Sequence, residues 1–119
     1  MEARYIQKGE SLDYLNTTDE KIKAGNVISL VTRIGVAGCD IAPGEVGSVE
    51  VVSVFEMPKS GKTAIPMGTA VYYDGTGITD EKERTAEDEE GTKTANIPAG
   101  YAVASAAADA TMVRVKLLG

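Results

Sequence analysis

VGSVEVVSVFEM, residues 46–57, is the longest strand-like run of the chain. Apolar and polar residues alternate through Val49 and Val51, and the alternation then shifts by one position at Val51-Val52 and resumes at Val54. Alternation with period two is typical of a β-strand, and a shift of phase is typical of a β-bulge or of a strand covered on both faces. We therefore expect this run to form the centre of the fold.

A short phrase with Ile three residues before Gly recurs four times around this run. The copies are Ile22-Lys23-Ala24-Gly25, Ile41-Ala42-Pro43-Gly44, Ile65-Pro66-Met67-Gly68 and Ile97-Pro98-Ala99-Gly100. A core Ile, a central Pro or Ala and a Gly that is free to take positive φ are typical of a β-turn leading into a strand. The copies are unevenly spaced, which argues against a solenoid. We interpret them as strand-entry turns of one sheet system, not as a repeat.

The remaining composition also favours strands. Val, Ile and Thr together number 31, whereas Leu and Met together number nine, and branched side chains fit a pleated surface better than a helix. Further strand-like runs lie at residues 3–7, 12–15, 27–34, 34–39, 69–73, 101–105 and 112–118. We expect an all-β fold, a compact β-sandwich or barrel of about eight short strands, with residues 1–119 as a single domain.

Residues 79–91, TDEKERTAEDEEG, interrupt this rhythm with seven acids and two bases. A high density of like charge without an apolar stripe is typical of a solvated segment. We expect a mobile acidic surface loop that folding does not require.

Charge and residue types exclude several classes of function. The chain has 12 basic and 18 acidic residues, no His, and Cys39 as its one cysteine. An acidic chain is a poor partner for nucleic acid or an anionic membrane. Without His, and with a single Cys, it has no Ser-His-Asp, Cys-His or His-rich zinc site. We expect no catalytic residue, metal or cofactor, no signal peptide and no membrane-spanning helix.

Two local motifs suggest chemistry, but each has a simpler interpretation. Ser60-Gly61-Lys62-Thr63 resembles the end of a phosphate-binding loop, yet Glu56 stands where that motif needs its first Gly. Asp74-Gly75-Thr76-Gly77 has oxygen ligands suited to calcium, but the spacing does not match a calcium loop. We interpret the first as an ordinary loop and the second as a hairpin turn.

Two further features allow packing or contact roles. Cys39 follows a strand-like run, and a lone Cys is usually a small buried residue. Tyr72 and Tyr73 are consecutive in a strand-like run, so one can pack inside while the other reaches an interface.

The order of short phrases along the chain resembles one protein family. The phrases are Gly9-x-x-Leu12-Asp13-Tyr14-x-Asn16, Lys23-Ala24-Gly25-Asn26-Val27, Gly35-Val36-Ala37, Asp40-Ile41-Ala42-x-Gly44-Glu45, Val54-Phe55-Glu56-Met57-Pro58-Lys59, Pro66-x-Gly68-x-x-Val71-Tyr72, Ile97-x-x-Gly100-Tyr101-Ala102 and Val113-Arg114-Val115-Lys116-Leu117. They resemble small proteins of tailed phages and prophages, formerly DUF2190, that are described as capsid cement or decoration proteins. The acidic segment 79–91 is the main departure from the family pattern.

This resemblance implies a non-catalytic virion protein. Such a protein binds the exterior of the assembled phage head and stabilises contacts between major capsid subunits. Its partner would be the major capsid protein, it would lie in the host cytoplasm before assembly, and we expect it to self-associate as a dimer or trimer. The alternative that the residues leave open is a small β-rich module that binds a glycan or small ligand through Tyr72, Tyr73 and Tyr101.

The N-terminal residues are candidates for partner contact. Residues 1–7 contain a strand-forming core, Arg4-Tyr5-Ile6-Gln7, and a terminal strand can pair with an exposed sheet edge on a neighbour. We expect Arg4, Tyr5 and Ile6 to contact the capsid or a second copy, the alternative being that they complete the chain's own sheet.

Overall fold

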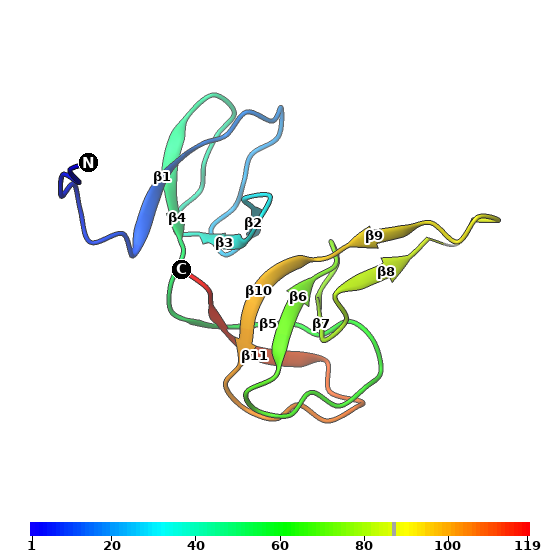
Figure 1. Cartoon of the computed structure of the whole chain (residues 1–119). Coiled ribbons are helices and arrows are strands. Elements are labelled where there is room, and N and C mark those ends of the chain that lie inside the picture. Colours follow the sequence, from blue (N-terminus) through cyan, green and yellow to red (C-terminus); the bar gives the residue numbers. More distant parts are fainter. Residues whose placement is uncertain (87) are drawn as a thin grey trace.

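Strands form all the regular structure in the computed structural model, which describes residues 1–86 and 88–119 (Figure 1). The strands are β1 (Ser11–Leu15), β2 (Val27–Ser29), β3 (Ile34–Ala37), β4 (Val46–Glu50), β5 (Val54–Pro58), β6 (Ala70–Tyr73), β7 (Ile78–Thr79), β8 (Glu83–Thr85), β9 (Lys93–Ala95), β10 (Ile97–Ala102) and β11 (Met112–Leu117). The all-β prediction is confirmed, with eleven strands in the described residues instead of about eight.

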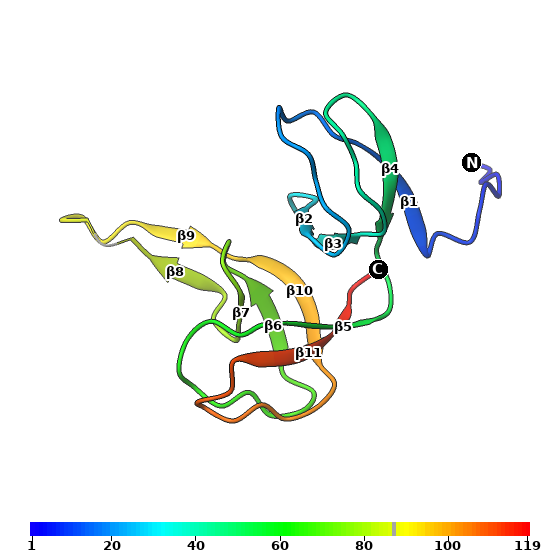
Figure 2. The same ribbon diagram turned by 180° about the vertical axis from the view of Figure 1, so that it is seen from behind.

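The strands form three antiparallel sheets. The first sheet has the order β1-β4-β3-β2, the second has the order β5-β11-β10-β6-β7, and β8 and β9 form a two-stranded sheet. Figures 1 and 2 show the first two sheets as adjacent bodies and the β8-β9 hairpin projecting from the second. The arrangement is sandwich-like, and the described strands form no closed barrel.

Residues 46–57 are not one strand. They divide into β4 of the first sheet and β5 of the second, and the break lies at Ser53, where φ is 102°. The shift of phase that predicted a bulge therefore marks the place where the chain crosses between sheets. Within the sheets β4 is an inner strand and β5 is an edge strand, so only half of the run is central.

Three of the four Ile-x-x-Gly phrases are turns that lead into strands. Gly25, Gly44 and Gly68 have φ between 79° and 89°, which a residue with a Cβ rarely adopts. The fourth phrase is different, because residues 97–100 lie inside β10. The fourth turn is instead residues 107–110, where the Ala110 N–H donates to the Ala107 carbonyl (3.0 Å).

The two larger sheets repeat one topology, so the interpretation as a single sheet system is wrong. Strands β1, β4, β3 and β2 correspond in order and pairing to β5, β11, β10 and β6. Ile22 and Ile41 exchange two backbone hydrogen bonds (2.9 and 2.8 Å), and Ile65 and Ala106 exchange the same two (2.9 and 2.8 Å). Further matching donor–acceptor pairs are Asn16–Glu45 with Lys59–Thr111, Gly25–Ala37 with Gly68–Ala102, Ala37–Asn26 with Ala102–Thr69, Gly38–Ser48 with Val103–Arg114, and Val51–Glu10 with Leu117–Ser53.

Gly35 and Gly100 occupy equivalent positions and meet the same requirement. Gly35 pairs with Ile28 as Gly100 pairs with Val71. A Cβ on Gly35 would overlap the Val49 side chain, and one on Gly100 would overlap the Lys116 carbonyl oxygen. Each glycine therefore allows the neighbouring strand to approach closely.

Strand β3 connects the two sheets through their apolar cores. All four of its residues are buried. Ile34 and Val36 belong to the larger core cluster, with Met57, Val71 and Val115 of the second sheet. Ala37 belongs to the smaller cluster, with Ile28, Val49 and Val51. The second sheet therefore completes its core with residues of the first.

We propose that the two sheets unfold together as one domain, because they share the larger core. Ile34→Ala should lower the stability of the whole chain by about 2 to 5 kcal/mol, the usual loss for a buried Ile. Scanning calorimetry should show one transition in both wild type and variant, at a lower temperature in the variant. Thr32→Ala, on the exposed adjoining turn, is the control. Two resolved transitions in the wild type would contradict a single domain.

Candidate interaction surface

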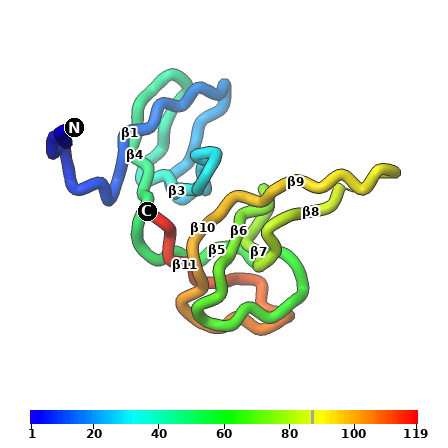
Figure 3. Tube along the Cα trace, in the orientation of Figure 1, coloured from blue at the N-terminus to red at the C-terminus, as the bar shows by residue number. Residues whose placement is uncertain are grey.

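The N-terminal arm, residues 1–9, lies outside every sheet of the described chain. Its side chains are largely exposed, including Tyr5 (80%) and Ile6 (78%). Gly9 turns the chain into β1 with φ of 80°, and Figure 3 shows the arm leading away from the body. Arg4, Tyr5 and Ile6 therefore do not complete the chain's own sheet, and their contact with a partner stays a prediction.

Strand β1 presents an open edge next to the arm. The even-numbered residues direct their backbone groups toward β4. At the two ends, the Asn16 N–H donates to the Glu45 carbonyl, and the Glu10 carbonyl accepts from the Val51 N–H. In an antiparallel pair the intervening residues direct their backbone groups outward, here Ser11, Asp13 and Leu15. No local pattern in SLDYL predicts this edge, because an edge is defined by which strands pair across the sheet.

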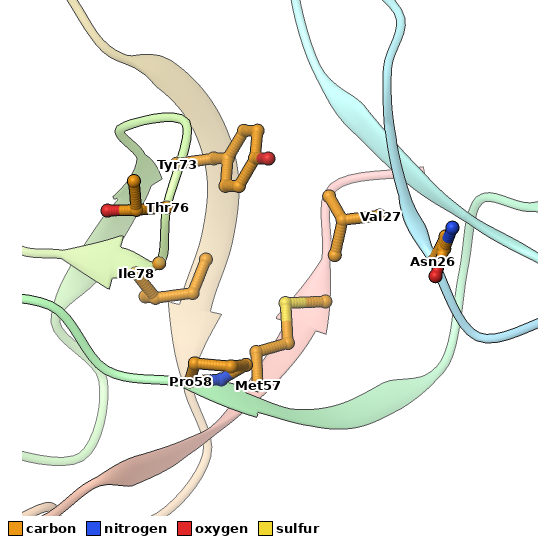
Figure 4. A pocket seen from close by; sticks show the side chains of 8 residues that line it. Asn26, Val27, Met57, Pro58, Tyr73, Thr76 and Ile78 are labelled. Carbon is orange, nitrogen blue, oxygen red and sulfur yellow. The ribbon is translucent and has the colours of Figure 1, made fainter. Parts of the chain in front are cut away.

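A cleft of about 280 Å³ lies between the two sheets (Figure 4). Asn26 and Val27 line it from the first sheet, and Met57, Tyr73 and Ile78 from the second. The Tyr73 hydroxyl donates to the Gly75 carbonyl (3.0 Å) and is therefore already engaged. Among the described residues that line this cleft, Tyr73 alone has an ionisable side chain.

Asp74 braces the turn between β6 and β7. Burial raises the pKa of its carboxyl. Hydrogen bonds from the Ser60 hydroxyl (2.6 Å) and from the Thr76 and Gly77 backbone N–H groups (2.9 Å each) lower the pKa by a larger amount, so the net pKa is below the usual value. A carboxyl group with a lowered pKa is ionised at neutral pH and is therefore poorly suited to act as a general acid. The reading as a turn is the one that fits.

Asp40 has a similar role in the first sheet. The Ala24 backbone N–H donates to its carboxylate (2.8 Å), and Lys21 lies 3.2 Å from the other oxygen; both lower the pKa of Asp40. The carboxylate thereby joins two turns. Within residues 1–86 and 88–119, no three His, Cys, Asp or Glu side chains are grouped to hold a metal ion.

The Ser60-Gly61-Lys62-Thr63 segment is a loop, as expected. Residues 61–63 are a bend with no helix after them, and the Ser60 hydroxyl is bonded to Asp74. Lys59, beside it, donates to the carbonyls of Ala108 (3.1 Å) and Gly61 (3.4 Å). This geometry provides no phosphate cradle.

Tyr73 and Tyr101 have different environments. Tyr73 packs against the larger core, whereas Tyr101 is partly exposed with Lys116 over its ring, 5.8 Å from the centroid.

Cys39 is exposed, so the expectation that it is buried is wrong.

The acidic segment 79–91 contains regular structure, and its residue 87 lies outside the described residues. Thr79 is buried in β7, and β8 pairs with β9. At the base, the buried Asn96 side chain donates to the Glu81 carbonyl (2.9 Å) and accepts from Arg84 (2.7 Å). The base of the hairpin is thus joined to the body, although β8 and β9 are exposed.

Comparison with protein families gives a match over nearly the whole chain. A family model described as phage cement protein matches residues 6–117. Comparison with curated proteins and with solved structures gives no match. Over the described residues, no helix has the length and apolar character needed to cross a bilayer.

Asp74→Asn should reduce stability at neutral pH by about 1 to 2 kcal/mol, because an amide is a weaker acceptor for these hydrogen bonds. Since the pKa of Asp74 is lowered on folding, its contribution is complete above the unfolded value of about 3.9 and is lost as pH falls through the folded value. The difference between wild type and variant in urea unfolding should therefore shrink at acid pH. Asp109→Asn, at an exposed site, is the control, and a difference independent of pH would contradict the bracing role.

Replacing residues 85–93 by a short Gly-Ser turn should leave the melting temperature within a few degrees, because the described side chains among them are exposed and loop length has a small entropic effect. Asn96→Ala should lower it by about 5 °C or more through the loss of buried hydrogen bonds. Circular dichroism melts of both variants test this. A large loss on truncation would show that the hairpin supports the core.

Proposed function

The chain belongs to the phage cement protein family, and from this we propose that it binds the exterior of the assembled phage head and stabilises contacts between major capsid subunits. A cement protein is a structural, capsid-associated component of a phage. The observation that carries the proposal is the family match over residues 6–117, which includes both sheets and the hairpin.

The nature of the described surface supports a binding role without catalysis. Asp40 and Asp74, two carboxylates with lowered pKa values, brace turns, and the cleft between the sheets has few free polar groups. In contrast, the N-terminal arm exposes apolar side chains, and the edge of β1 has outward backbone groups. Exposed arms and sheet edges are suited to association with another protein.

The contacting residues that we propose are Arg4, Tyr5 and Ile6, toward the capsid or a second copy. Self-association as a dimer or trimer would present several head-binding surfaces together, and multiple weak contacts then add to a large avidity. We place the protein on the virion exterior, and in the host cytoplasm before assembly.

Co-sedimentation with purified heads tests this function. We expect the chain to sediment with expanded heads and not to bind free major capsid subunits, because the site would be formed by subunits in their assembled arrangement. Bound heads should also withstand higher temperature or chelator before they release DNA.

Heads collected before expansion provide the matched control. Failure to bind expanded heads at micromolar concentration would contradict the proposal, as would equal binding to free subunits. Binding without any gain in head stability would leave a decoration role and overturn the stabilising one.

A further inference from the structure

The repeated topology allows the edge of the first sheet to be compared with its equivalent in the second. Strands β1 and β5 are equivalent edge strands, and residues 11, 13 and 15 correspond to residues 54, 56 and 58. These are the positions whose backbone groups point away from the sheet. The two equivalent edge strands can therefore be compared for how each is protected against pairing with a further strand.

The edge of β5 is protected. Pro58 has no N–H to offer to another strand. Beyond it, the chain at β7 lies against the end of β5, where Lys59 and Ile78 form a parallel bridge and the Ser60 N–H donates to the Ile78 carbonyl (2.8 Å). Glu56 adds a charge at the edge and pairs with Arg114 (3.7 Å).

The edge of β1 shares the charge, because Asp13 stands at the position of Glu56, but it lacks the proline and the covering strand. Leu15 stands at the position of Pro58 and keeps its N–H, and its side chain is half exposed. The first sheet also has no counterpart of β7, because a tight turn at residues 30–33 joins β2 directly to β3. The Ser11 carbonyl accepts a hydrogen bond from the Gln7 side chain (3.1 Å), while Asp13 and Leu15 have no backbone partner on this side among the described residues.

The residue types and charge of the arm suit it to pair with this edge as an additional strand. It contains Tyr5 and Ile6, both strongly exposed, and aromatic and β-branched residues favour strands. Residues 1–8 carry two bases and one acid, whereas residues 10–15 carry two acids and no base. An arm with excess positive charge is unusual in a chain of net charge −6, and it complements the acidic edge.

We propose that the arm of one copy adds as an extra strand to the open edge of β1 in a second copy. In the structure each arm leads away from its own β1 (Figure 3), so the strand available to a given edge is that of a neighbour. Backbone hydrogen bonds to Asp13 and Leu15 would provide affinity, and contact of Tyr5 and Ile6 with exposed Leu12 and Leu15 would exclude water. The inference rests on the proposed self-association and not on the presence of heads.

Sedimentation velocity over the micromolar range, without heads, tests the pairing. The full chain should form a dimer or trimer. Deletion of residues 1–7, or Tyr5→Asp with Ile6→Asp, should weaken association by at least about a hundredfold with an unchanged melting temperature, because these residues contact no core. Met67→Ser, at another exposed apolar residue, is the matched control and should associate as wild type.

The edge is tested separately by Leu15→Pro, which removes the outward N–H as Pro58 does in β5. Leu15→Ala keeps that N–H and controls for loss of the side chain. Leu15→Pro should be monomeric, and Leu15→Ala should still associate. If Leu15→Pro lowers the melting temperature, the arm substitutions provide the test, because they lie outside the folded body.

Mixing decides between arm exchange and any other mode of association. The chain without residues 1–7 has an edge but no arm, and Leu15→Pro has an arm but no usable edge, so each should be monomeric while an equimolar mixture forms a one-to-one complex. A wild type that stays monomeric, an armless chain that still associates, or a mixture without complex would overturn the inference. Head binding measured with the same variants is a separate result: monomers that bind heads would leave the proposed function standing.

Discussion

Strand β3 is buried on both faces, and the arrangement of the molecule depends on this constraint. One face supplies Ile34 and Val36 to the core of the second sheet, and the other contributes Ala37 to the core of the first. A strand in this position needs small as well as apolar residues, because a Cβ at Gly35 would overlap the Val49 side chain. With few aromatic residues, the chain builds two small cores that share one strand, and neither sheet has enough large side chains to enclose itself.

The two halves share the pairing order of four strands and differ at their edges. Matching backbone hydrogen bonds hold the turns before β2, β4, β6 and β11, so the interior follows one plan twice. The second half then adds β7, the β8-β9 hairpin and a proline in its edge strand. The first half adds the N-terminal arm and leaves β1 open. Where two halves share one arrangement, the features that differ between them are good candidates for serving separate functions.

Local signals explain what could be predicted from the sequence. Branched residues and Gly-containing turns report the state of neighbouring backbone, so the all-β fold and three of the turns were predictable. The crossing at Ser53 was not, because a shift of phase has the same appearance in a bulge and in a change of sheet. In the sequence Gly100 resembles a turn glycine, but inside β10 it allows the backbone of the neighbouring strand to approach closely. The duplication is hidden because equivalent residues such as Ile41 and Ala106 differ in type and the second half has a long insertion. For the interaction surface, exposed arm residues could be predicted, but the open edge depends on long-range pairing.

The position of that insertion bears on how the fold can change. In the first half, four residues join β2 to β3, and in the second half the equivalent connection from β6 to β10 contains β7, β8 and β9. The flanking strands pair alike at Gly35 and Gly100, although the β6–β10 pairing shifts register between Pro98 and Gly100 on the side of the insertion. Both connections therefore begin and end on paired strands. Val31, in the short connection, has a φ of 74°, which is unfavourable for a β-branched residue. A longer peptide placed there would relieve this conformation and would extend into solvent, which makes the β2–β3 turn a natural point for displaying foreign sequence on this scaffold.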